Sequence, residues 1–348
     1  MMNENELKKN AVKNAPLEHL SLPRIIDLHC DLLSYLADKP GRTPNDPASR
    51  CSYPQLQAGH VQLQTLAIYT ATSPHSIEKG RAQIEQFLQL LKHYPEQFSL
   101  GIKSQNSTVQ ILPAFENASS FADETEPFLY AITRLEDYLK QIGPLFYISL
   151  TWDEENRFGG GNRSKVGLKE DGSRLLEWMS GKRIALDFSH TSDRLAEDLF
   201  NCIDKNSLDI PVIASHSNFR AISPYPRNLP DDIAKEIIHR KGLIGLNFFA
   251  SFIHDTDPSA IFRHVEYALS LGGENALSFG ADFFCDLDMG KFLLEKYHRS
   301  EAYYKGLDNA SVYPSLLTSF AQKLKLKEEQ ILKIASKNAL EFLKDRIL

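Results

Sequence analysis

The sequence predicts an α/β protein, a (β/α)8 barrel of the TIM type with extra C-terminal helices. Three observations predict it. The chain has 348 residues, which suits one large barrel domain. Short apolar and aromatic runs recur along it and alternate with segments of helical periodicity. Most of these runs are apolar throughout, which is typical of parallel strands covered on both faces.

Eight of the apolar runs are expected to be strands. Strands that alternate with helices indicate a parallel sheet, and eight of them favour a closed barrel over an open doubly wound sheet. The predicted strands are Arg24–His29, Val61–Tyr69, Val109–Glu116, Leu145–Thr151, Arg183–His190, Ile210–His216, Leu243–Phe249 and Ala276–Phe283.

Helical patterns separate most of these strands, and two more follow the last one. Pro230 with two acidic residues opens one helix, because proline and acids favour the first turn. The Gly272-Gly273 pair ends another. The predicted helices are Ser76–Tyr94, Glu126–Ile142, Ser192–Asn206, the one opening at Pro230, Pro258–Leu271, Ser315–Lys325 and Lys327–Leu348. We expect residues 1–20 to form a flexible N-terminal arm and residues 21–348 a single domain.

Composition excludes several classes of function. The formal net charge of −6 provides no electrostatic reason to expect a nucleic-acid partner. No stretch reaches the roughly 18 apolar residues that a membrane span needs. The N-terminus is polar and lacks the apolar segment of a secretory signal, so a cytoplasmic location is expected. The four cysteines show no C-x-x-C spacing, and free thiols are expected.

Metal-type side chains stand at the ends of five predicted strands. His29 and Asp31 end the first strand, and an H-x-D pair places both side chains on one face of an extended chain. Taken alone, the pair also fits a polar strand end. The same ambiguity applies to the other four, which close later strands and are Glu116, His190, His216 and Asp282.

Their shared position favours a metal site. The carboxyl ends of barrel strands meet at one mouth, where ligands from separate strands converge. Imidazole and carboxylate ligands without cysteine suit Zn²⁺, with Mn²⁺, Co²⁺ or Fe²⁺ as alternatives. The set exceeds what one tetrahedral zinc needs, so it indicates two ions that share Glu116. Asp282 is then placed to take a proton from a shared water and pass it to a leaving amine.

The motifs resemble those of the membrane dipeptidase (renal dipeptidase) family of zinc peptidases, within the amidohydrolase-like barrels. The matching pieces occur in family order over nearly the whole chain, and the pair SHSNFRAI and RNLPDD is the most specific. They are IDLHCD at 26–31, Glu116, DFSH at 187–190, SHSNFRAI at 215–222, RNLPDD at 227–232, GLIGLNFF at 242–249, GAD at 280–282 and KNALEFL at 337–343.

The resemblance implies a zinc dipeptidase that uses a hydroxide held between two zinc ions. His29 and Asp31 would bind one ion, His190 and His216 the other, and Glu116 both. Asp282 would be the acid and base. Arg227 would bind the free C-terminal carboxylate of a dipeptide, although without the resemblance a surface salt bridge is the simpler interpretation. The resemblance also implies a homodimer, and no membrane anchor is expected for this chain.

Three departures from the family pattern concern the substrate wall. Trp152 stands where the family commonly has a histidine that binds substrate and the developing oxyanion. Losing such a donor can cost about a hundredfold in turnover. Trp152 either donates from its indole N–H or only shapes the pocket. Asn156 and Gly159–Gly161 follow and are candidates to compensate, although the glycine run also fits a flexible loop. The second departure is Glu116-Asn117-Ala118, where the family often has Glu-Gly-Gly. The third is Asp282-Phe283-Phe284-Cys285, where the family usually has Asp-Phe-Asp-Gly.

Two other functions stay open at this point. One is a related amidohydrolase that opens another amide or a lactone. The other is a non-catalytic metal-binding barrel, which the replacement at Trp152 suggests. Intact ligands argue against the second, because a close cluster of carboxylates and imidazoles is costly to hold without an ion.

Overall fold

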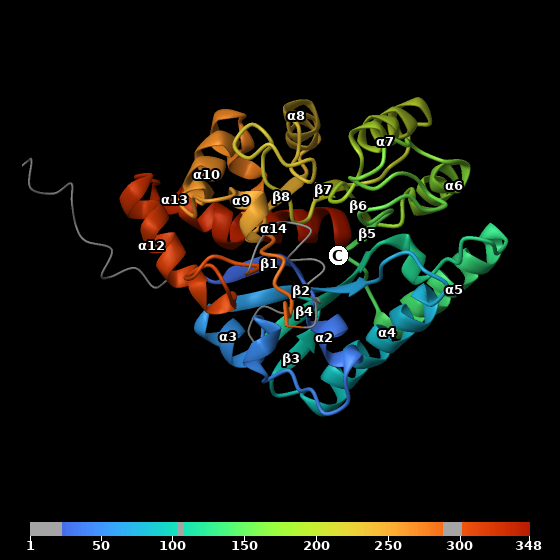
Figure 1. Cartoon of the computed structure of the whole chain (residues 1–348), viewed down its shortest axis with the longest axis horizontal. Helices are drawn as coiled ribbons and strands as arrows, with labels where there is room; N and C mark the ends of the chain where they lie inside the picture. The colour runs from blue at the N-terminus through green and yellow to red at the C-terminus, as the bar shows by residue number, and fades with distance from the viewer. Residues whose placement is uncertain (1–22, 103–107, 288–300) are drawn as a thin grey trace, which may run out of the picture.

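The computed structural model describes residues 23–102, 108–287 and 301–348. Its centre is a barrel of parallel strands with helices around it (Figure 1). The ring order is β2-β1-β9-β8-β7-β6-β5-β4, and pairing of β4 with β2 closes it, so the predicted barrel is confirmed. The strands are β1 (Ile25–Cys30), β2 (Val61–Tyr69), β4 (Val109–Glu116), β5 (Tyr147–Ser149), β6 (Ala185–Asp187), β7 (Val212–Ala214), β8 (Leu243–Leu246) and β9 (Leu277–Phe279).

One strand was not predicted. β3 (Phe98–Leu100) pairs with Val109–Ile111 at the start of β4. On the same edge of β4, β5 pairs only with Phe115 and Glu116, farther along the strand. Because β5 is so short, it leaves the beginning of that edge open, and β3 covers the exposed backbone groups there. The run was too short for the sequence pattern to distinguish it from a loop.

Six of the seven predicted helices are present with ends shifted by a few residues. The seventh, Lys327–Leu348, is divided into two short α-helices, each followed by a π-helical segment, Lys333–Lys337 and Leu343–Ile347. Shorter helices that the sequence pattern did not single out follow several strands. Within the described residues, no helix is both long and apolar enough to cross a membrane. The helices are α2 (Leu32–Asp38), α3 (Tyr53–Ala58), α4 (Ser76–His93), α5 (Phe128–Ile142), α6 (Glu170–Met179), α7 (Asp193–Lys205), α8 (Asp231–His239), α9 (Ala250–Ile253), α10 (Ala260–Ser270), α12 (Tyr313–Lys323), α13 (Glu328–Leu332) and α14 (Asn338–Phe342).

The C-terminal segment closes the amino end of the barrel. Phe342 and Leu343 belong to an apolar cluster with residues near the strand starts, and the Phe342 ring lies 6.3 Å from that of Phe146. The Asn338 side chain donates to the carbonyl oxygens of Glu274 (2.9 Å) and Leu277 (2.8 Å), which fixes α14 against β9. With this end filled, only the carboxyl end of the barrel remains for a site. The proposed arm at residues 1–20 lies outside the described residues.

His264 is a buried histidine on α10. Its Nε2 lies 2.9 Å from the carbonyl oxygen of Ile253, and its Nδ1 accepts from the backbone N–H of Phe219 at 3.3 Å. Burial lowers the pKa of His264 to about 4. These two hydrogen bonds require the neutral ring with its proton on Nε2.

We predict that His264 makes stability fall with acidity. Between pH 6.5 and 4 the unfolded chain binds a proton at this position that the folded chain does not. The contribution of His264 to the free energy of unfolding is therefore complete above pH 6.5. It declines by about 3 kcal/mol as the pH falls toward 4. In urea unfolding, His264→Gln, which keeps one donor and one acceptor, should show a shallower decline over this range. If the free energies of unfolding of wild type and His264→Gln declined in parallel with pH, the pH dependence could not be assigned to His264.

Candidate metal centre

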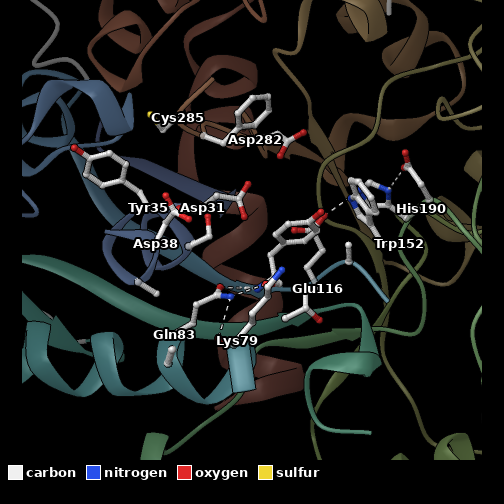
Figure 2. Close-up of a pocket in the computed structure, with 18 of the residues that line it drawn as sticks. Asp31, Tyr35, Asp38, Lys79, Gln83, Glu116, Trp152, His190, Asp282 and Cys285 are labelled. Atoms are coloured by element: carbon white, nitrogen blue, oxygen red, sulfur yellow. Dashed lines mark hydrogen bonds and ion pairs between the residues drawn. The ribbon is translucent and has the colours of Figure 1, made fainter. Parts of the chain in front are cut away.

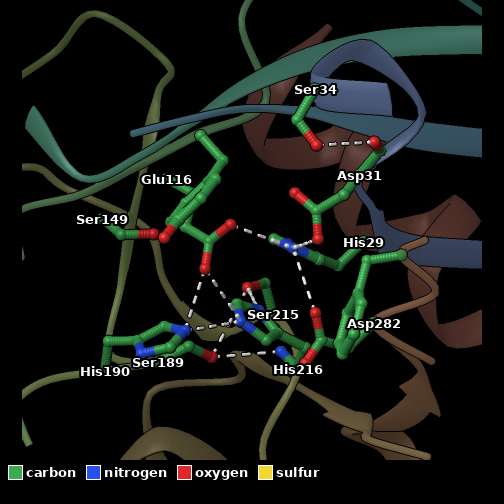
Figure 3. A network of polar contacts seen from close by, with 12 residues as sticks. His29, Asp31, Ser34, Glu116, Ser149, Ser189, His190, Ser215, His216 and Asp282 are labelled. Atoms are coloured by element: carbon green, nitrogen blue, oxygen red, sulfur yellow. Dashed lines mark hydrogen bonds and ion pairs between the residues drawn. The ribbon is translucent and has the colours of Figure 1, made fainter. Parts of the chain in front are cut away.

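Six side chains converge at the carboxyl end of the barrel (Figure 3). They come from five strands, because each lies within a strand end or up to three residues beyond it. All six are buried, and each was predicted from the sequence. They are His29 and Asp31 at the end of β1, Glu116 at the end of β4, His190 after β6, His216 after β7 and Asp282 after β9.

Glu116 lies at the middle of this cluster. Its Oε2 is 3.3 Å from Nε2 of His29, and its Oε1 is 2.9 Å from Nε2 of His190 and 3.6 Å from Nε2 of His216. The Nε2 atoms of His190 and His216 are 3.1 Å apart. One carboxylate therefore faces His29 with one oxygen and the two other histidines with the second.

Asp31 and Asp282 complete the His29 side of the cluster. Their carboxylate oxygens lie 3.8 Å and 3.6 Å from Nε2 of His29. His29, Asp31 and Asp282 form one group that could hold an ion, and His29, Glu116 and His216 form another. Asn247 donates to Oδ2 of Asp282 at 2.8 Å, which leaves Oδ1 as the oxygen nearest His29.

Each histidine is oriented by a contact to its Nδ1. His29 contacts the hydroxyl of Tyr147 at 2.6 Å, and His216 contacts that of Ser215 at 2.6 Å. Nδ1 of His190 lies 3.2 Å from Oδ1 of Asp153. Such contacts fix the ring and direct Nε2 toward the centre of the cluster, as second partners of metal-binding histidines do.

Sequence reasoning missed these partners. Ser215 and Asp153 adjoin residues that it did select, His216 and Trp152. Tyr147 points to the barrel interior from β5, which only the structure's register shows.

Two buried carboxylates support the cluster from below. Asp187 accepts from the hydroxyls of Ser149 and Ser215, both at 2.7 Å, and so extends the contact made to His216. Asp27 accepts from the backbone N–H groups of His29 and Ala281, both at 3.1 Å, and joins β1 to the segment after β9. Burial raises the pKa of Asp27. The hydrogen bonds offset the cost of burying these carboxylates.

His190 and Asp282 have left-handed backbone conformations, with φ of 69° and 62°. Residues other than glycine adopt this region uncommonly, because Cβ crowds the neighbouring carbonyl, although Asn, Asp and His do so more often than the others. Strain of this kind costs on the order of 1–3 kcal/mol and is concentrated at functional sites. The chain turns sharply at the end of each strand, and the turn directs these two side chains into the cluster.

The electrostatics of the His29 side of the cluster favour positive charge, whereas burial and the neighbouring His29 lower the pKa of His216 well below its ordinary value. Burial opposes the protonated form of His29, but Tyr147 and Glu116 raise its pKa well above the ordinary value. Burial raises the pKa of Asp282 to about 7. Nε2 of His29 and Oδ1 of Asp31 are buried and have no hydrogen-bond partner among the described residues. Leaving such atoms unpaired is costly, so this donor set fits a metal ion.

The three residues predicted to contact substrate lie in different surroundings. Trp152 lines the pocket above the cluster, packs edge-to-face on Tyr69 with ring centroids 5.2 Å apart, and lies 6.0 Å from the His190 ring. The Asn156 side chain is buried and donates to the carbonyl of Leu150 at 2.7 Å and accepts from the N–H of Phe158 at 2.8 Å. Asn156 also donates to Oδ1 of Asn117 at 2.9 Å, so it joins the loop after β5 to the residue that follows Glu116.

Arg227 is buried next to His216. Its guanidinium donates to the carbonyl oxygen of His216 at 3.0 Å and to the hydroxyl of Ser217 at 2.7 Å, while Nε has no partner among the described residues. Phe252, which lines the pocket, lies beneath the guanidinium, 5.6 Å from it. Arg227 thus adjoins the cluster with its buried Nε unpaired, although it is not among the residues that line the pocket.

Close packing explains the glycine run after Trp152. A Cβ on Gly161 would lie 1.9 Å from the carbonyl oxygen of Trp152, and one on Gly160 would lie 2.3 Å from that of Val166. The run lets the loop after β5 fold back against itself and hold Trp152 and Asp153 at the pocket.

The pocket over the cluster has a volume of about 500 Å³ (Figure 2). Asp31, Glu116, His190 and Asp282 form one part of its wall. The remainder consists mostly of aromatic and polar side chains from α2 and the loop after it, the end of β2, α4 and the segments after β5, β8 and β9. They include Tyr35, Asp38, Arg42, Tyr69, Lys79, Gln83, Trp152 and Phe252.

The structure resembles known metallopeptidases over almost its full length. A metallopeptidase from Rhodobacter sphaeroides, solved with a phosphinate mimic of the dipeptide L-Ala-D-Ala, superposes with a TM-score of 0.78 at 20% identity. The match covers 94% of this chain and 100% of that one. An amidohydrolase from Pseudomonas aeruginosa superposes with a TM-score of 0.71 at 18% identity, over 93% of this chain and 97% of that one. At these identities the likeness shows the fold.

Among curated proteins, similarity reaches an uncharacterized protein from the PQQ-III 3' region of Acinetobacter calcoaceticus. The two are 32% identical over 146 residues, which is 38% of this chain and 43% of that protein. A second, from the pqqA 5' region of Klebsiella pneumoniae, is 29% identical over 160 residues, or 42% of this chain and 55% of that protein. The chain thus spans about half the length of these curated relatives.

The family model of the membrane dipeptidases matches residues 19–346. This match confirms the resemblance drawn from the sequence motifs, and with it a family of metal-dependent peptidases. The convergent cluster, the barrel and the family match agree, and the chain belongs to the membrane dipeptidase family, peptidase family M19.

Proposed function

We propose that this chain is a metal-dependent dipeptidase that hydrolyses dipeptides with a free C-terminal carboxylate. The observation that carries the proposal is the position of Glu116, with one oxygen facing His29 and the other facing His190 and His216. A carboxylate shared in this way is suited to two adjacent ions.

In this proposal zinc is the metal, with Mn²⁺, Co²⁺ or Fe²⁺ as alternatives that the same donors accept. His29 and Asp31 would hold one ion, His190 and His216 would hold the second, and Glu116 would be a ligand that both share. Bound ions would polarise the scissile carbonyl and lower the pKa of the attacking water. The contacts to Nδ1 leave each histidine with Nε2 directed at its ion.

The chain's own residues supply proton transfer and orientation. Asp282, fixed through Oδ2 by Asn247, uses Oδ1 to accept a proton from water and to return it to the leaving amine. Arg227 binds the C-terminal carboxylate with the donor capacity left over near His216. Trp152 and Tyr69 form an apolar wall that excludes water from the reacting peptide bond.

Removing a ligand from the His29 side should abolish both metal binding and activity. We expect His29→Ala and Asp31→Ala to contain less metal than wild type by elemental analysis after zinc reconstitution, and to hydrolyse no dipeptide, because each removes an atom that no other residue replaces. Thermal unfolding in the presence of chelator serves as the control for folding. Full metal occupancy with full activity in both variants would refute the assignment.

Changing the proton-transfer group should separate chemistry from metal binding. Asp282→Asn keeps the shape of the side chain and the contact to Asn247 but cannot accept a proton. We expect kcat to fall by about a hundredfold or more, while the metal content stays near that of wild type. A matched decrease of metal content and kcat would instead assign Asp282 to metal binding.

Substrate profiling distinguishes the alternatives. Hydrolysis of dipeptides, including those that end in a D-residue, supports the proposal. If dipeptides are not hydrolysed and other amides or lactones are, the protein is a related amidohydrolase. Near-zero bound metal after reconstitution would favour a non-catalytic barrel.

A further inference from the structure

We propose that the pocket selects dipeptides whose N-terminal residue carries an acidic side chain, and that Lys79 binds this second carboxylate. The inference rests on the proposed dipeptidase function and adds the substrate class. It follows from three features of the pocket: a charge without a partner, its position across the barrel from Arg227, and the space between the two.

Lys79 is the cation of the pocket whose charge is not neutralised. Among the described residues, its ammonium group has neither a hydrogen bond nor an ion pair. The other cation on the wall, Arg42, donates to the carbonyl oxygen of Tyr35 at 2.8 Å and lies 3.5 Å from Asp38. The charge and the three N–H donors of the Lys79 ammonium group are therefore available to an anionic ligand.

The position of Lys79 follows from the helix that bears it. Lys79 and Gln83 are four residues apart on α4, so they lie on one face of the helix, and both line the pocket. Gln83 hydrogen-bonds to the backbone N–H of Tyr69 at 2.8 Å, which holds this face of α4 against the end of β2. In Figure 2, Lys79 and Gln83 lie on the α4 side of the pocket, and His190 and Trp152 lie on another.

Lys79 and Arg227 lie on opposite sides of the barrel mouth. Lys79 belongs to the helix after β2, and Arg227 to the segment after β7. In the ring order β2 and β7 are four places apart among eight strands, which makes them diametrically opposed. The cluster around Glu116 occupies the space between them.

This arrangement orients a dipeptide. With the C-terminal carboxylate at Arg227 and the peptide bond over the cluster, the N-terminal residue extends toward α4. The volume of about 500 Å³ leaves room there for a long side chain. The five carboxylates on the pocket wall each face other groups. Asp31, Glu116 and Asp282 face the metal cluster, Asp153 faces His190 and Arg163, and Asp38 lies 3.5 Å from Arg42 and 3.9 Å from Lys39. The charge that an incoming acidic side chain meets near α4 is that of Lys79.

The test compares Glu-Ala with its neutral counterpart Gln-Ala on the zinc-loaded enzyme. Wild type should prefer Glu-Ala in kcat/KM, and Lys79→Met should reduce kcat/KM for Glu-Ala by roughly fivefold, the scale of a partly exposed ion pair. The loss should appear in KM, with Gln-Ala changed less than twofold, and Lys79→Arg should retain the preference. Lys92→Met, at the exposed far end of the same helix, is the matched control.

A binding measurement separates this inference from the proposed function. Calorimetry with phosphinate pseudodipeptides that carry a Glu or a Gln side chain at the N-terminal position needs no turnover. Tighter binding of the Glu form, lost in Lys79→Met and weakened at high salt, supports Lys79 even if no dipeptide is hydrolysed. Equal binding of both forms by wild type, or equal losses on both in Lys79→Met, would overturn the inference and leave the dipeptidase proposal intact.

Discussion

The contact between Glu116 and three histidines is the constraint on which the rest of the site depends. A buried carboxylate is costly unless opposite charge or hydrogen bonds surround it. Here His29, His190 and His216 hold the pKa of Glu116 well below its ordinary range, although burial opposes this. Because the histidines come from three strands, satisfying this one side chain requires the barrel to be closed and in register.

The surrounding protein serves to keep these side chains in place. Tyr147, Ser215 and Asp153 fix the imidazoles, and Asp27 and Asp187 hold the strand ends through backbone and hydroxyl donors. A polar layer of this kind inside a barrel is stable only when its members are paired. The barrel end below it is filled by apolar side chains and the C-terminal helix, so water has no route to the cluster from that side.

Much of this architecture could be predicted from the sequence, because its signals are local. Apolar runs ending in His, Asp or Glu indicated both the strands and the six clustered residues. Contacts between distant segments leave no such signal. In the sequence, Tyr147 is one aromatic residue among others in a predicted strand. Its contact with His29 depends on how the barrel strands are aligned with one another. Asn156 was expected at the substrate, and its amide hydrogen-bonds to Leu150 and Phe158 and to Asn117 in the segment after β4, contacts that no sequence pattern indicates. The predicted homodimer and cytoplasmic location stay predictions.

The pairing of β1 with β9 has a consequence for how the site is made in time. His29 is on the first strand of the barrel and Asp282 follows the last, and α14, which fills the barrel floor, comes later still. During synthesis β1 gains its second neighbour only after β9 has emerged. The ligand cluster therefore assembles only after all eight barrel strands have been made, and an ion can be captured in its final geometry only from that point on.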